Sequence, residues 1–139
     1  MEMNDYSYEQ IEMGKVFQFD KILTSQDIEQ FSKITGDENP LHLDEDYAKT
    51  THFGGRICQG MLVASLLSTL FGMVCPGKRN LYLSQTLNFK KPVKMDSEVT
   101  IRGTVKQKID SLKIIIVKTE IFCDEELILD GEAKVQIIN

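Results

Sequence analysis

Both histidines of the 139-residue chain lie in one turn-rich segment, residues 36–61, together with five carboxylates and four glycines. Within this segment Asp37 and His42 are five positions apart, and Pro40 lies between them. A proline-containing turn can direct both side chains toward one point. A carboxylate and an imidazole that converge on one water molecule can remove one proton from it and deliver another. We therefore predict that Asp37 and His42 form an acid/base pair.

The same residues could instead have a local structural role, bind a metal or support a nucleophile. Asp37 and His42 could serve only the turn, because Asp is common in turns for local reasons. A metal is not expected, since His42 and His52 lack the spacing that puts two imidazoles on one helix face and no EF-hand loop is complete. A nucleophile is disfavoured because no G-x-S-x-G elbow occurs and Cys58 has no evident base.

Gly60 is the second feature with chemical potential, because it opens a run of 18 residues without a charge, residues 60–77. Such a run predicts a helix that is buried on every side. The N–H groups of Gly60 and Met61 would then be free, at the positive end of the helix dipole, where they could stabilise an oxyanion. Glycine also allows a carbonyl oxygen to approach the main chain closely.

The elements that must position these groups follow from the spacing of apolar residues. Thr24 and Asp27 form a capping-box pattern before a helix that ends at Gly36, and Asp44 is expected to cap a short helix through residue 49. Residues 37–41 are expected to be a turn or extended loop. Strands are predicted over residues 16–23, 81–89, 97–109, 112–123 and 127–138, with a hairpin turn at Asp110-Ser111. In the second of these strands, the expected half-buried face consists of Leu81, Leu83, Leu87 and Phe89.

This order of elements predicts an α+β fold in which a curved antiparallel sheet wraps one long buried helix. The length and the 42% hydrophobic content fit a single domain, residues 1–139. A sheet of this size around one helix leaves an edge open. We therefore predict a homodimer that forms through the sheet.

The charge distribution limits the possible partners. A net charge of −5 argues against nucleic acid, which calls for a basic surface. Residues 57–95 nevertheless contain no Asp or Glu and five cations, which are Lys78, Arg79, Lys90, Lys91 and Lys94. These cations are either a solvated basic rim or contacts to a small ligand that carries phosphate groups.

Cysteine usage and the chain's apolar runs point to a soluble cytoplasmic protein. The three cysteines have no C-x-x-C spacing, so reduced thiols are expected. The N-terminus is acidic and lacks the layout of a signal peptide. The longest strongly apolar run, residues 61–75, is shorter than a membrane span.

The segment GDENPLHLDEDYAKTTHFGGRICQGMLVASLLS, residues 36–68, resembles the signature of MaoC-like (R)-specific enoyl-CoA hydratases. In that signature D-x-N-P-x-H-x-D is followed by A-x-x-T-x-F and by G-M-L-x-A-S. The resemblance continues through PGKRNLYLSQTLNFKKPV and the terminal DGEAKVQI. It implies a hot-dog fold, normally dimeric, and an enzyme that hydrates a trans-2-enoyl thioester of coenzyme A to the (R)-3-hydroxyacyl thioester without a cofactor.

The resemblance also implies which residues act. The family's catalytic Asp and His correspond to Asp37 and His42, its oxyanion donor to Gly60, and its active-site serine to Ser68. We expect Asn39 to brace the loop and Ser68 to hydrogen-bond the histidine or line the acyl tunnel, although its hydroxyl could instead bond back to a helix carbonyl. The other residues expected to contact substrate are Arg56, Met61, Lys78, Arg79, Lys90 and Lys91.

One position departs from the family pattern, since many members have His where this chain has Gln59. We expect Gln59 to change hydrogen bonding near the mouth of the site while the chemistry is kept, which leaves substrate preference open. The alternatives are a 3-hydroxyacyl-thioester dehydratase that acts on acyl carrier protein or a specialised acyl-CoA, a hot-dog thioesterase, and a non-catalytic acyl-thioester-binding protein. The sequence does not determine acyl chain length, carrier, direction of reaction, or which of Asp37 and His42 is the base.

Overall fold

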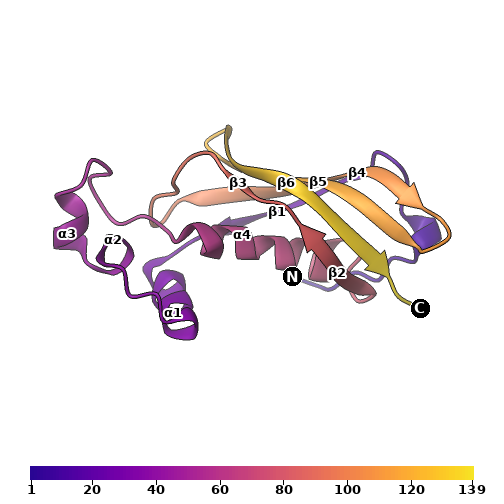
Figure 1. The fold of residues 1–139 in the computed structure, drawn as a ribbon, viewed down its shortest axis with the longest axis horizontal. Helices are drawn as coiled ribbons and strands as arrows, with labels where there is room; N and C mark the ends of the chain where they lie inside the picture. Colours follow the sequence, from indigo (N-terminus) through magenta and orange to yellow (C-terminus); the bar gives the residue numbers. More distant parts are fainter.

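A curved antiparallel sheet covers helix α4 (Gly60–Thr69) in the computed structural model, which describes residues 1–139 (Figure 1). The strand order is β1-β4-β5-β6-β2, and the short β3 also pairs with β6. The strands are β1 (Val16–Ile22), β2 (Asn80–Gln85), β3 (Asn88–Phe89), β4 (Glu98–Ile109), β5 (Ile114–Cys123) and β6 (Glu126–Ile137). This arrangement confirms the predicted α+β hot-dog fold.

Three further helices precede α4, and two of them begin and end as the sequence predicts. Helix α1 (Ser25–Thr35) starts at the Thr24–Asp27 capping box and ends at Gly36, whose φ of 80° is left-handed. Helix α3 (Glu45–Lys49) starts at Asp44, whose side chain accepts from the N–H of Tyr47.

The short helix α2 (Pro40–Leu43) corrects the expectation of a turn or loop through residue 41. Asn39 is non-helical, as a residue before proline should be, and its side chain caps the helix by accepting from the N–H of Leu41. Proline at the first helical position is favourable, because its missing N–H would have no helical partner there. This extra turn carries His42.

Apolar side chains from both layers form one core. Helix α4 contributes Leu62, Val63, Ala64, Leu66 and Leu67, and the π-helical segment Leu70–Val74 continues it with Leu70 and Phe71. However, Met61, Ser65 and Ser68 lie on an exposed face, so the expectation of burial on every side is wrong for that face. No helix is long and apolar enough to cross a membrane.

The predicted strand over residues 81–89 is divided into β2 and β3, and in β2 the inward face is the opposite of the one expected. Leu87, between the two strands, packs against the core as expected. Tyr82 points to the core, where its ring meets that of Phe71 edge-on at a centroid distance of 5.1 Å. Leu81 and Leu83, on the other face, are about half exposed. The core therefore takes the large aromatic side chain, and alternation along the strand puts the leucines outside.

The connections between strands also differ from those predicted from the sequence. The link between β4 and β5 spans four residues, 110–113, in place of a two-residue turn. The two-residue turn instead joins β5 to β6, where Asp124 and Glu125 both have positive φ, as the twist of a tight hairpin requires.

The break between β2 and β3 rests on a close main-chain contact at Gly131. A Cβ atom at this position would lie 1.8 Å from the carbonyl oxygen of Thr86, whose N–H donates to the carbonyl of Glu132 at 2.9 Å. We predict that Gly131→Ala lowers the free energy of unfolding by about 2 kcal/mol or more in urea titrations, because main chain must move. Gly72→Ala is the control, since nothing lies within 4 Å of its Cβ position. Equal stability of the two variants would contradict the proposed crowding.

Candidate active site

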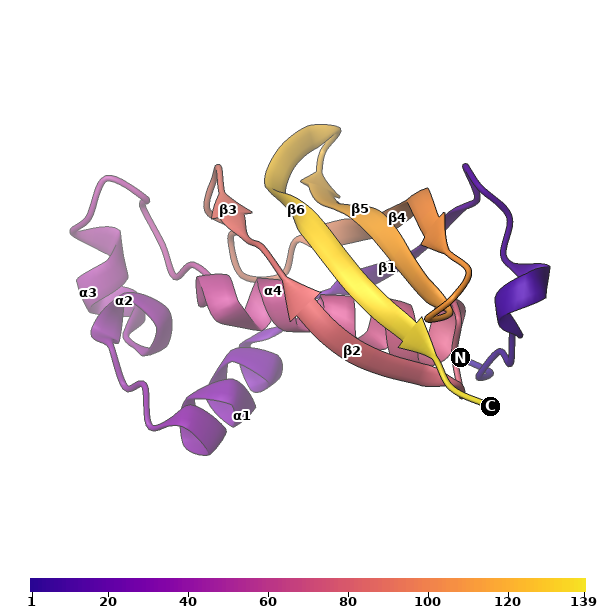
Figure 2. The ribbon, with the colours of Figure 1, turned by 45° about the vertical axis from the view of Figure 1, so that its right-hand side comes forward.

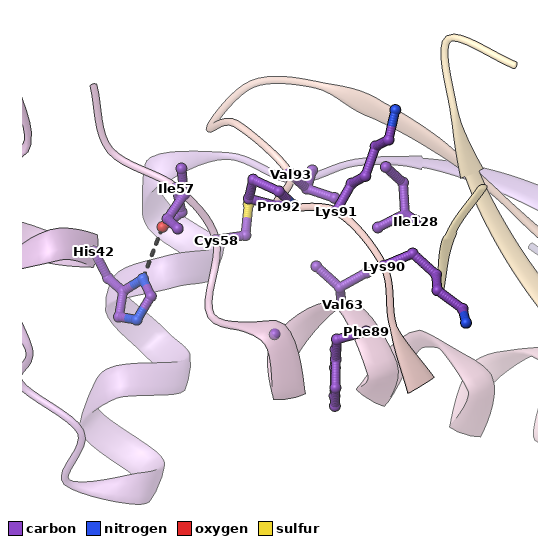
Figure 3. A pocket seen from close by; sticks show the side chains of 11 residues that line it. His42, Ile57, Cys58, Val63, Phe89, Lys90, Lys91, Pro92, Val93 and Ile128 are labelled. Atoms are coloured by element: carbon purple, nitrogen blue, oxygen red, sulfur yellow. Dashed lines mark hydrogen bonds between the residues drawn. The ribbon is translucent and has the colours of Figure 1, made fainter. Parts of the chain in front are cut away.

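A pocket of about 290 Å³ lies at the N-terminal end of α4 (Figure 3). His42 of α2 and Gly60 of α4 both line it, together with Phe89 of β3 and the two lysines that follow. The rest of the wall is mostly apolar and includes Ile57, Val63, Pro92, Val93 and Ile128. An apolar pocket with a few converging polar groups is typical of a small-molecule site.

The imidazole of His42 is held by a hydrogen bond from outside its own helix. Its Nδ1 lies 2.9 Å from the carbonyl oxygen of Ile57, on the loop that leads into α4. A carbonyl oxygen can only accept, so Nδ1 carries the proton and Nε2 is the nitrogen with a free lone pair. Arg56 donates through Nε to the carbonyl of His42 and so attaches the same loop to α2.

Asp37 lies on the exposed turn between α1 and α2, and both its main-chain N–H and its main-chain carbonyl form hydrogen bonds. Its N–H donates to Thr35 Oγ1 at 3.2 Å, and its carbonyl accepts from Ser32 Oγ. Its Oδ1 accepts from the N–H of Asn39 at 3.1 Å. Asn39 thus braces the turn on both sides. Asp37 does not line the pocket and makes no hydrogen bond to His42, although both belong to this one braced turn.

Gly60 is the first residue of α4, and no side chain caps the helix there. The first helical hydrogen bond runs from the N–H of Val63 to the carbonyl of Gln59, so the N–H groups of Gly60 and Met61 have no helical partner. These two donors lie at the positive end of the helix dipole, where an oxygen that gains negative charge is stabilised.

Phe89 is a pocket residue that the sequence did not indicate. Its ring covers Gly60 so closely that a Cβ atom on the glycine would lie 3.1 Å from Cε1. The side chain remains 52% exposed. Spacing alone assigned Phe89 to a face of the sheet, and no local pattern reveals that β3 bends over the start of α4.

The cations of the acid-free segment do not form one surface. Lys90 and Lys91 line the pocket, and Lys91 also pairs with Glu126 at 2.7 Å. Lys78 and Arg79 directly precede β2, which begins at the end of α4 farthest from α2 (Figure 1). Arg79 is paired there with Asp5 at 2.6 Å. Within one chain, therefore, the expected substrate contacts of Lys78 and Arg79 are not near His42.

Ser68 and Met61 lie on the exposed face of α4. Ser68 is eight residues from Gly60, which corresponds to about 12 Å along a helix. It does not line the pocket with His42, so a hydrogen bond between these two side chains of one chain is not formed. The bond back to a helix carbonyl occurs at Ser65, whose Oγ donates to Leu62 O at 2.6 Å.

The remaining candidates have structural roles. Cys58 lines the pocket but is buried, and burial raises the pKa of its thiol to about 12, which opposes formation of a nucleophilic thiolate. His52 is exposed beside Phe53, at a ring-centroid distance of 4.0 Å. No three His, Cys, Asp or Glu side chains are close enough together to hold a metal ion.

Comparison with known proteins shows the family of the chain. Residues 8–125 match the family model described as "MaoC like domain". The chain is 37% identical to a 3-hydroxybutyryl-CoA dehydratase of Methylorubrum extorquens, over 94% of this chain and 83% of that protein. It is 38% identical to an (R)-specific enoyl-CoA hydratase of Aeromonas caviae, over 94% of this chain and 98% of that protein. The solved structure of R-hydratase PhaJ1 from Pseudomonas aeruginosa superposes with a TM-score of 0.94 at 32% identity, over 99% of this chain and 88% of that one.

Proposed function

The chain belongs to the MaoC-like (R)-specific enoyl-CoA hydratase family, and we propose that it hydrates trans-2-enoyl-CoA to (R)-3-hydroxyacyl-CoA through Asp37, His42 and Gly60. One observation carries the assignment of residues. His42, whose Nδ1 is bonded to Ile57, and Gly60, whose N–H has no helical partner, line the same apolar pocket. A base and an oxyanion donor in one such pocket are what the addition of water to a conjugated thioester requires.

Gly60 acts on the carbonyl end of the substrate. When the thioester oxygen accepts from the N–H of Gly60, electron density moves toward that oxygen and Cβ becomes electrophilic. The donor is fixed in the helix before the reaction begins, so it need not reorganise as charge develops. Phe89 and Val63 exclude water from the neighbouring wall, which strengthens this interaction.

His42 acts on the water. Its Nδ1 is committed to the carbonyl of Ile57, so we assign Nε2 as the acceptor of the proton that water loses as its oxygen bonds to Cβ. The imidazolium then returns a proton to Cα on the same face, and the elements of one water molecule have been added. We propose that the carboxylate of Asp37, which does not line the pocket in a single free chain, orients the water by accepting its second hydrogen.

Lys90 is the cation that we propose for contact with a phosphate of coenzyme A. It lies at the pocket and forms no ion pair, whereas Lys91 is already paired with Glu126. For Lys78 and Arg79 a contact with substrate held in the same chain is not proposed. Arg56 supports the site instead, because its guanidinium bonds to the main chain of His42.

The exposed face of α4 supports a homodimer as the working form. Strand β2 ends the strand order, and its Leu81 and Leu83 are about half exposed, as is Met61 in the first turn of α4. A second copy would cover these groups. Ser68 lies on the same face of α4 as Met61, so we place it at the dimer contact. We also propose a cytoplasmic location, which the three free cysteines support.

The proposed reaction is tested by following loss of the enoyl-thioester absorbance with crotonyl-CoA and with longer homologues. Chiral analysis of the product should give the (R)-3-hydroxyacyl thioester. Absence of hydration with every chain length, or formation of the (S) product, would overturn the proposal.

Asp37→Asn and His42→Ala should each lower kcat for hydration by at least about a hundredfold, the usual scale for loss of an acid/base partner. The chain offers matched controls in Asp46→Asn and His52→Ala, which change the same residue types at exposed positions of the same segment. Steady-state kinetics of the four variants checks the assignment. A site variant that keeps the turnover of its control would lose its assigned role.

Gly60→Val should lower kcat/KM by at least about a hundredfold, since loss of one oxyanion donor costs about 2.7 to 4 kcal/mol. The β-branched side chain must displace Phe89 and would obstruct the approach of the thioester oxygen. Gly60→Ala should be milder, because the ring of Phe89 need yield only slightly. Kinetics is paired with thermal unfolding, and a valine variant as stable and as active as the original protein would remove the oxyanion role.

Light scattering at micromolar concentration should give a mass near twice 15.8 kDa. Leu83→Lys, on the edge strand, should shift the mass toward one chain because a buried lysine would be unpaired. Leu112→Lys is the control, since Leu112 is equally apolar and exposed but lies in the turn between β4 and β5. A mass near 15.8 kDa for the unaltered protein would refute the dimer.

A further inference from the structure

Only three polar or charged residues of the chain are buried, and two of them join α1 to the active site. Ser32 is 5% exposed, Gln59 is 3% exposed and Thr119 is fully buried. Burial of a polar group is unfavourable unless a hydrogen bond compensates, so each position needs a reason. Thr119 accepts from Gln85 inside the sheet layer at 2.9 Å. The other two each form a hydrogen bond that involves α1. Gln59 donates to a carbonyl within α1, and Ser32 of α1 donates to the carbonyl of Asp37.

Gln59 immediately precedes Gly60, at the capping position of α4, yet its side chain does not cap that helix. The amide turns away and donates through Nε2 to the carbonyl of Ile28, inside α1, at 3.1 Å. Its Oε1 is buried without a partner. Ser, Thr, Asp and Asn are preferred at such positions because their side chains accept from the first N–H groups. Because the Gln59 side chain points away from α4, the first N–H groups of that helix remain free for a substrate oxygen.

Ser32 lies one turn after Ile28 on the inner face of α1. Its Oγ donates to the carbonyl of Asp37, just beyond the end of the helix. Helix α1 begins close to the start of α4 and extends away from it toward the loop that leads to α2 (Figure 2). A continuous path therefore leads from Gly60 through the Gln59 side chain to α1, and from α1 through Ser32 to Asp37.

We infer that Gln59 and Ser32 are positioning residues for the hydration reaction. Together they fix, through α1, the placement of the Asp37 carboxylate relative to the oxyanion donor of Gly60. This inference rests on the proposed function, because it concerns the relative placement of Asp37 and Gly60, two of the groups to which that function assigns catalysis. It also explains how Gln59 differs from the His of many family members without loss of chemistry, since both side chains present an N–H donor.

The decisive variant is Gln59→Met, which keeps the length of the side chain and removes the donor. We expect kcat to fall at least about tenfold, because misplacement of a catalytic group is costly even when it is small, while KM changes less than about twofold. Ser32→Ala, at the other end of the path, should have an effect of the same kind. Gln59→His retains a donor and should recover most of the lost kcat.

The same substitution made in Asp37→Asn protein distinguishes a positioning role of Gln59 from a general effect on stability. In Asp37→Asn protein no catalytic carboxylate remains to be placed, so Gln59→Met should lower the residual kcat by less than about twofold. An equal loss in both backgrounds, or wild-type kcat for Gln59→Met, would overturn the inference. In either case the unaltered protein still hydrates crotonyl-CoA, so the proposed function is unaffected.

Hydrogen exchange followed by mass spectrometry provides a readout that needs no activity. Gln59→Met should speed exchange in residues 36–42, because the turn after α1 is less firmly held, and should leave the paired region of β4 and β5 unchanged. If the unaltered protein failed to hydrate enoyl thioesters, the proposed function would fall while this measurement still tested the path. Unchanged exchange in residues 36–42 would refute the proposed path from Gln59 through α1 to Asp37.

Discussion

The burial of α4 against the concave side of the sheet is the constraint on which the rest of the structure depends. Residues 60–77 carry no charge, so this helix cannot face water on most sides, and the six-stranded sheet supplies its cover. Once the helix is enclosed, its first turn lies where the chain enters the core, at the loop of residues 56–59. The N–H groups of Gly60 and Met61 are then available at an apolar boundary, and the short helix that carries His42 lies at the same pocket.

The sequence predicted those parts of the fold that depend on neighbours along the chain. The Thr24–Asp27 capping box, the left-handed Gly36 and the Asp44 cap were all identified, because each involves side chains within three or four residues of the helix end. The residue before Pro40 was also assigned correctly as non-helical. The helix that begins at Pro40 itself differs from the predicted loop, because a proline that excludes helical dihedrals at the residue before it is also favourable at the first helical position.

The parts that could not be predicted depend on contacts between distant residues. Period-two alternation located a strand after residue 80 but could not tell which face points inward, and the ring contact of Tyr82 with Phe71 decides that. The partner of His42, Ile57, is 15 residues away and acts through its main chain, so residue type gives no signal. The cations of residues 57–95 are close in sequence, yet β2 and the turn after it separate Arg79 from Lys90 along the molecule. Family resemblance indicates the proposed catalytic residues, whereas the structure shows which groups hold them.

The thiol of Cys58 has a consequence for the durability of the enzyme. An α,β-unsaturated thioester is an electrophile toward sulfur as well as toward water, and a thiolate in the pocket would be alkylated by the enzyme's own substrate. Burial raises the pKa of Cys58 to about 12, which disfavours the thiolate at neutral pH. The low polarity proposed to strengthen the Gly60 donor thus also keeps this sulfur protonated, which opposes its alkylation by an unsaturated thioester.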